Sequence, residues 1–185
     1  MTLVKIKEII DSIPNNKSFS SIIDFITKNY HSPSRIKLIE LEKKIDFLEQ
    51  KFWEKYEELK EVKILFSQYY NSYINHINKE EDFLFKKIKE LEEKINNNEE
   101  VLEKELISIE IDLKKQNIEH EEFEIYWANF LWLLLNSKIK NENIKEYEEL
   151  VKQLEDFRIE SMIHSKIESY YLDILVWDAI YKIKK

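Results

Sequence analysis

Hydrophobic residues recur along most of the chain at the spacing of amphipathic helices. Between Pro33 and Asn96 they occupy two positions of a seven-residue repeat. One position holds Leu38, Ile45, Phe52, Leu59, Phe66 and Tyr73, and the other holds Leu41, Leu48, Val62, Tyr69 and Phe83, with Lys55, His76 and Glu80 as exceptions. Such a repeat is typical of helices that pack as coiled coils. It predicts one helix over residues 33–95, begun by Ser32 as N-cap and Pro33.

Three further helices are predicted on the same grounds: residues 3–30 broken at Pro14, 98–137 and 143–184. The fold is therefore predicted to be all-α, an elongated antiparallel bundle of about four long helices in a single domain of residues 1–185, with coiled-coil-like packing. The helix at 98–137 has a second apolar face and is expected to contact neighbours on both sides. That face holds Ile107, Ile111, Ile118, Ile125, Trp132 and Leu135.

Composition narrows the class of protein further. The chain of 185 residues has no glycine and no cysteine, so strands, disulfides and thiolate metal sites are not expected. Its start lacks the apolar run of a signal peptide, and its longest nearly apolar run, 125–135, is too short to cross a bilayer, so we expect a cytoplasmic protein without a membrane span. Its richness in Lys, Ile and Asn suggests an AT-rich bacterial or mobile-element source.

Charge argues against duplex nucleic acid as a partner. The formal net charge is −8, and lysines are scattered between glutamates rather than gathered in a basic patch. No glycine-rich phosphate loop or nucleophile triad is present. The leading hypothesis is therefore a protein-interaction, accessory or regulatory subunit that acts through long acidic helix faces and forms a homodimer or binds a protein partner. It is not expected to be an enzyme or to need a cofactor.

One constellation stands apart from this general pattern. Three of the four histidines have a glutamate four residues later, which places both side chains on one helix face. In an antiparallel bundle the three pairs lie at one height, because residue 76 faces residue 118 and residue 120 faces residue 162. Arg158 reaches the same height. The predicted polar layer consists of His76, Glu80, His120, Glu124, Arg158, His164 and Glu168.

Two interpretations of this layer follow from its chemistry. The leading one is a hydrogen-bonded histidine–carboxylate layer that fixes the register of the bundle and holds no metal. The alternative is a metal site for zinc, iron or manganese, since imidazoles and carboxylates from facing helices suit these ions. Its ligands would be His76, His120, His164, Glu80, Glu124 and Glu168. The Glu-x-x-His pattern of ferritin-like proteins and the His-x-x-x-His of hemerythrins are absent.

A third interpretation comes from the segment Arg158-Ile-Glu-Ser-Met-Ile-His164. It resembles the Arg-x(4–6)-His motif of the HEPN ribonucleases, helical proteins of bacterial defence and toxin systems. The resemblance covers seven residues and implies metal-independent cleavage of RNA. In that case His164 would be the acid–base group and Arg158 would bind the phosphate. Ile159 departs from the motif, which commonly has a polar residue after the arginine.

Overall fold

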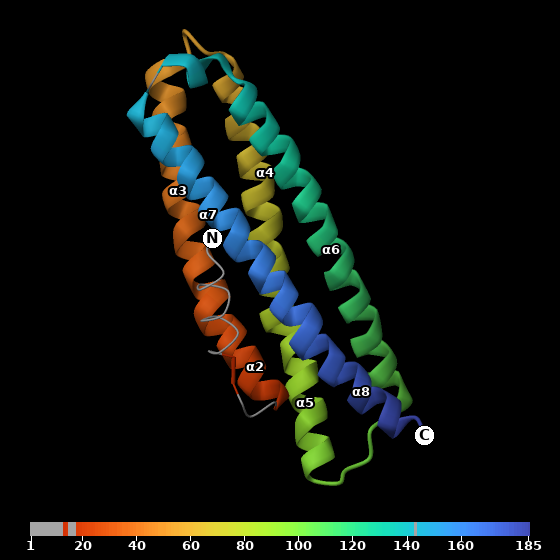
Figure 1. Ribbon diagram of the computed structural model, residues 1–185. Helices are drawn as coiled ribbons and strands as arrows, with labels where there is room; N and C mark the ends of the chain where they lie inside the picture. The colour runs from red at the N-terminus through yellow and green to blue at the C-terminus, as the bar shows by residue number, and fades with distance from the viewer. Residues whose placement is uncertain (1–12, 15–17, 143) are drawn as a thin grey trace.

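Four long antiparallel helices make up the part of the protein that the computed structural model describes, residues 13–14, 18–142 and 144–185 (Figure 1). No strand occurs within these ranges. The helices pack side by side into one elongated bundle, which confirms the predicted all-α fold. No helix in the described ranges has the length and hydrophobicity needed to cross a membrane.

Short non-α segments interrupt or connect these helices. The first helix comprises α2 (Phe19–Ile26), η1 (Thr27–His31) and α3 (Ser32–Phe52). The second comprises α4 (Glu58–Lys79), η2 (Glu80–Leu84) and α5 (Phe85–Asn96), and the third is α6 (Glu103–Asn136). After a 3-10 turn, η3 (Lys138–Glu142), the fourth comprises α7 (Lys145–Ile167), η4 (Glu168–Leu172) and α8 (Asp173–Ile183). The segments η1, η2 and η4 are π-helical.

The first reversal of the chain lies at residues 53–57, not at Ser32–Pro33 as the sequence indicated. The first helix runs through Pro33, because the preceding turn is π-helical and the Ser32 N–H bonds to the Thr27 carbonyl five residues back. A wider turn accommodates a residue that lacks an N–H. The predicted helix 33–95 is thus two antiparallel helices, and Lys55, an exception to its heptad, lies in the turn between them.

The predicted end of the second helix at residue 95 agrees with the structure to within one residue, whereas the third helix begins at Glu103 rather than at residue 98. The second helix ends at Asn96, and Asn98 adopts the left-handed conformation that asparagine tolerates. Ser18 caps the first helix through its side chain, which accepts a hydrogen bond from the Ser21 N–H. Residues 3–12 and 15–17 of the predicted first helix and Asn143, the predicted start of the fourth, lie outside the described residues.

The core is divided along the bundle into two apolar clusters. One is formed mainly by α3, α4, α7 and the C-terminal half of α6, and the other by α2, α5, α8 and the N-terminal half of α6. Buried histidines and glutamates lie between them. The second apolar face of α6 does not contact neighbours as expected: Ile118, Ile125 and Trp132 are 57%, 63% and 68% exposed. Among the described residues, the helix packs within the bundle on one face only.

Candidate metal centre

Each of the four helices contributes one histidine to a single buried layer at the middle of the bundle. They are His31 at the end of η1, His76 in α4, His120 in α6 and His164 in α7. Two glutamates join them, Glu80 at the start of η2 and Glu168 at the start of η4. Both carboxylates are almost inaccessible to solvent, with exposures of 3% and 0%. The layer therefore contains six ionisable side chains shielded from water.

The four histidines form two pairs that meet through their Nε2 atoms. His31 Nε2 lies 2.9 Å from His164 Nε2, and His76 Nε2 lies 3.0 Å from His120 Nε2. One pair joins the first and fourth helices, and the other joins the second and third. Because Nε2 is a metal-binding atom of neutral imidazole, each pair directs two nitrogen donors to one point.

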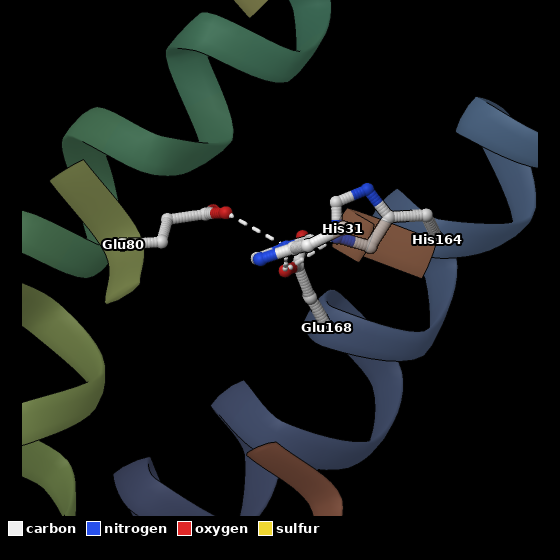
Figure 2. A group of neighbouring side chains, drawn as sticks. All are labelled: His31, Glu80, His164 and Glu168. Atoms are coloured by element: carbon white, nitrogen blue, oxygen red, sulfur yellow. Dashed lines mark hydrogen bonds and ion pairs between the residues drawn. The ribbon is translucent and has the colours of Figure 1, made fainter. Parts of the chain in front are cut away.

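The two glutamates lie between these pairs and face both of them. Glu80 places Oε2 3.3 Å from His31 Nε2 and Oε1 3.1 Å from His76 Nε2. Glu168 places Oε1 2.8 Å from His164 Nε2 and Oε2 3.2 Å from His120 Nε2. Figure 2 shows the half formed with His31 and His164, in which Glu80 approaches from a different helix than Glu168. Each carboxylate thus offers one oxygen to each histidine pair.

Hydrogen bonds within the described residues do not satisfy this set of donors and acceptors. Both oxygens of Glu80 and Oε2 of Glu168 are buried and accept no hydrogen bond, although histidine nitrogens lie 3.1–3.3 Å away. Buried polar atoms without partners are rare in native proteins, and a bound ion or an ordered water molecule would supply the missing partner.

The donor atoms fall into two sets with the dimensions of metal sites. One set is His31, Glu80, His164 and Glu168, and the other is His76, Glu80, His120 and Glu168; within each set all four donor atoms lie within 4.8 Å of one another. At metal–ligand bonds of 2.0–2.1 Å, neighbouring donors are about 2.9 Å apart in an octahedron and about 3.4 Å apart in a tetrahedron. The observed nitrogen–nitrogen distances of 2.9 and 3.0 Å are close to the octahedral value.

The outer nitrogens of three histidines are held by other side chains. His31 Nδ1 lies 2.8 Å from a Glu81 oxygen, and His76 Nδ1 lies 2.6 Å from a Glu119 oxygen. His164 Nδ1 lies 3.4 Å from the Tyr73 hydroxyl. A carboxylate that accepts a hydrogen bond from Nδ1–H fixes the imidazole tautomer and leaves Nε2 free to bind a metal ion. Glu81 and Glu119 are therefore suited to orienting two of the ligands.

Nearby carboxylates raise the pKa of two of the four histidines, whereas burial lowers the pKa of a third, His164. Burial lowers the pKa of His31, but the carboxylates of Glu168, Glu80 and Glu81 outweigh it and raise the pKa to about 11. Burial likewise lowers the pKa of His76, whereas Glu80 and Glu119 raise it to about 9. Burial raises the pKa of Glu168, but His164, His120 and His31 bring it well below its ordinary value. Metal ions would replace the histidine protons on binding.

Three π-helical turns position residues of this layer. The segment η1 ends at His31, while η2 and η4 begin at Glu80 and Glu168. In η2, the backbone N–H of Glu80 bonds to the carbonyl oxygens of His76 and Ile77. In η4, the N–H of Glu168 bonds in the same way to the carbonyl oxygens of His164 and Ser165. Single π-turns in α-helices occur frequently at functional sites. Their location at three of the six donors indicates a site with a function beyond packing.

No protein-family model matches the chain, and comparisons with curated proteins and with solved structures found no match either. The interpretation of the layer rests on its own geometry.

Five of the seven residues predicted for the polar layer lie together, and two lie outside it. Glu124 and Arg158 are exposed, and neither belongs to either set of donors. Glu124 follows His120 by one turn, but the helix carries it out of the layer to the surface. Sequence reasoning missed His31, because the reversal predicted at Ser32–Pro33 separated it from the other histidines. The signal that was available is the nearly equal spacing of all four histidines along the chain.

Proposed function

We propose that the protein is a dinuclear metalloprotein. Each ion would bind two histidines, His31 with His164 or His76 with His120, and both would share Glu80 and Glu168. The observation that carries the proposal is the placement of one oxygen of each glutamate beside each histidine pair. Bridging carboxylates suit two-metal sites, in which the ions lie about 3.5–4 Å apart.

Iron and manganese suit this ligand set. The donors are imidazole nitrogens and carboxylate oxygens, which exclude the thiolate-rich sites of structural zinc and iron–sulfur clusters. By analogy at the level of fold, four-helix bundles hold di-iron and di-manganese centres through glutamates and histidines from all four helices. The pattern here differs, with His-x-x-x-Glu on two helices and a lone histidine on the other two. Four protein donors per ion would leave positions open for a small ligand.

The geometry favours this function over an HEPN-like ribonuclease. His164 is buried, and its Nε2 lies 2.8 Å from Glu168 and 2.9 Å from His31, whereas Arg158 is exposed. An acid–base group that acts on RNA must contact the substrate. Both residues line a cavity of about 20 Å³, which has room for about one water molecule. The interaction-protein hypothesis stays a prediction and is compatible with a metal centre.

Metal analysis tests the proposal directly. The protein is first depleted of metal with a chelator, then reloaded with Fe²⁺ or Mn²⁺ in the absence of oxygen, and finally desalted. We expect it to retain about two ions per chain, measured by elemental mass spectrometry. Excess Mg²⁺ in the buffer suppresses binding to the acidic surface, because Mg²⁺ prefers oxygen ligands and occupies such sites. Retention of less than about 0.3 ion per chain with both metals would contradict the proposal.

Self-association is a second candidate function, supported by the exposed face of α6. Ile111, Ile118, Ile125 and Trp132 follow one another every seven residues and are 46–68% exposed. A heptad stripe without a partner in its own chain suits packing against the same stripe of a second copy. We therefore propose a homodimer through α6.

Charge introduced into the stripe should separate the dimer. We expect the double variant Ile118→Glu, Ile125→Glu to be a monomer by light scattering at concentrations where the unaltered protein is a dimer, because two buried charges per chain would remain unpaired. The matched control is Ile36→Glu, Ile64→Glu, which changes residues of similar exposure on α3 and α4. A monomeric unaltered protein, or equal dissociation of both variants, would contradict this assignment.

A further inference from the structure

Gln116 is a buried amide with no hydrogen-bond partner. It is only 4% exposed, and neither its amide nitrogen nor its amide oxygen bonds to any described residue. Gln116 precedes His120 by one turn, so both side chains lie on the same face of α6. In the antiparallel pair of α4 and α6, His76 meets His120, which brings Gln116 level with Glu80 one turn away. An unsatisfied amide thus lies next to an unsatisfied carboxylate.

A groove leads from the surface to this position. It has a volume of about 330 Å³, and its lining includes His76, Glu80 and Gln116. Its lining also contains three lysines, of which Lys79 pairs with Glu119 and Lys87 pairs with Asp112. The third, Lys115, has no ion-pair partner among the described residues. The lining holds as many acids, Glu80, Asp112 and Glu119, as lysines, so Lys115 is the lysine of this groove whose charge is left unpaired among the described residues.

The opposite half of the layer is closed by aromatic rings. His31 stacks on Phe85 with ring centres 5.6 Å apart, and His164 stacks on Tyr30 at the same distance. His31 is fully buried. Apart from the shared carboxylates, no polar side chain without a partner corresponds to Gln116 beside this histidine pair among the described residues. The two halves share their carboxylates, but His76 borders the groove of about 330 Å³, whereas His164 borders only the cavity of about 20 Å³.

We propose that the half formed by His76 and His120 binds a small anion, which reaches the metal ion through this groove and accepts a hydrogen bond from the Gln116 amide. This inference rests on the proposed dinuclear centre. Two divalent ions and two bridging carboxylates carry a net charge of about +2, which attracts an anion, as does the unpaired Lys115 in the groove. The Gln116 amide is a neutral hydrogen-bond donor. Without it, one atom of the bound anion would be buried and would have no hydrogen-bond partner.

Azide is a suitable probe, because it is a small anion that binds metal ions at open positions. The protein is loaded with Co²⁺, and the cobalt content is measured first. Azide is then titrated while the visible absorption of the cobalt ions is followed. We expect a saturable spectral change in the unaltered protein. In Gln116→Leu we expect two cobalt ions per chain and an azide affinity about three- to tenfold weaker, because one hydrogen bond is lost.

Two variants make the result specific to this position. Gln153→Leu makes the same change at an exposed glutamine of α7 and should leave the azide affinity unchanged. Gln116→Glu keeps the size of the side chain but adds a negative charge beside Glu80, and should weaken azide more than tenfold. Failure to bind two cobalt ions would refute the dinuclear centre itself. If two cobalt ions bind but azide causes no spectral change, only the anion site is refuted. The same holds if the azide affinity is equal in the unaltered protein and in both Gln116 variants.

Discussion

Replacing Glu168 by alanine should abolish the binding of both metal ions. Glu168 is fully buried and contacts histidines of both pairs, so one substitution removes an oxygen donor from each ion. It also removes negative charge between two divalent cations. At a separation of 3.5–4 Å and an effective dielectric constant of 20, their repulsion is on the order of 15–20 kcal/mol before ligands offset it. We expect less than about 0.3 ion per chain in the desalted variant, measured as for the unaltered protein.

Removal of one histidine pair should instead leave one ion. The double variant His31→Ala, His164→Ala deletes both nitrogens of one half, and His76→Ala, His120→Ala deletes those of the other. Each should retain about one ion per chain. The matched control for all these variants is Glu124→Ala, which removes an exposed carboxylate one turn from His120 and should retain two ions. Two ions in Glu168→Ala, or loss of metal in Glu124→Ala, would refute the proposed ligand set.

The helical fold could be predicted from the sequence because hydrophobic periodicity and the lack of glycine act locally. The first reversal of the chain could not. Residues 53–57 contain neither glycine nor proline, and the only local sign of a turn was Lys55 at a heptad position. At Ser32–Pro33 the sequence predicts a helix start where the structure has none. The residues resemble an N-terminus, but they lie inside a helix, because the preceding π-turn accommodates the proline. Helix breaks that depend on packing between distant segments leave little trace in the local sequence.

The layer of histidines could be predicted in part, because antiparallel helices obey simple register rules. That rule placed residue 76 beside residue 118, and the structure pairs His76 with Glu119 and His120. The register rule could not show that Glu124 faces solvent. A spacing of four residues places two side chains on the same face of a helix, but it does not determine which of them is buried in the bundle. Nor could the register rule show that each carboxylate is shared between two histidine pairs, or that a π-turn begins at Glu80 and another at Glu168.

Metal removal should lower the melting temperature by roughly 15–30 °C. Without metal, the bundle buries ionisable groups whose oxygens lack partners, which opposes folding. An ion present at about 1,000 times its dissociation constant stabilises the folded state by about 4 kcal/mol, so two ions contribute about 8 kcal/mol. Each kcal/mol shifts the melting temperature by about 2–4 °C in a protein of this size. Circular dichroism of chelator-treated protein, with and without added Mn²⁺, measures the difference.

This measurement separates a metal centre from a layer that only fixes the register of the helices. In a purely structural layer, His120→Ala would cost about 1–3 kcal/mol for the partners left without hydrogen bonds, and added Mn²⁺ would not change the melting temperature of any variant. In a metal centre, the gain from Mn²⁺ should vanish in Glu168→Ala and persist in Glu124→Ala. A shift of less than about 3 °C in the unaltered protein at saturating Mn²⁺ and Fe²⁺ would favour the structural layer. The buried oxygens of Glu80 would then need ordered water as their partner.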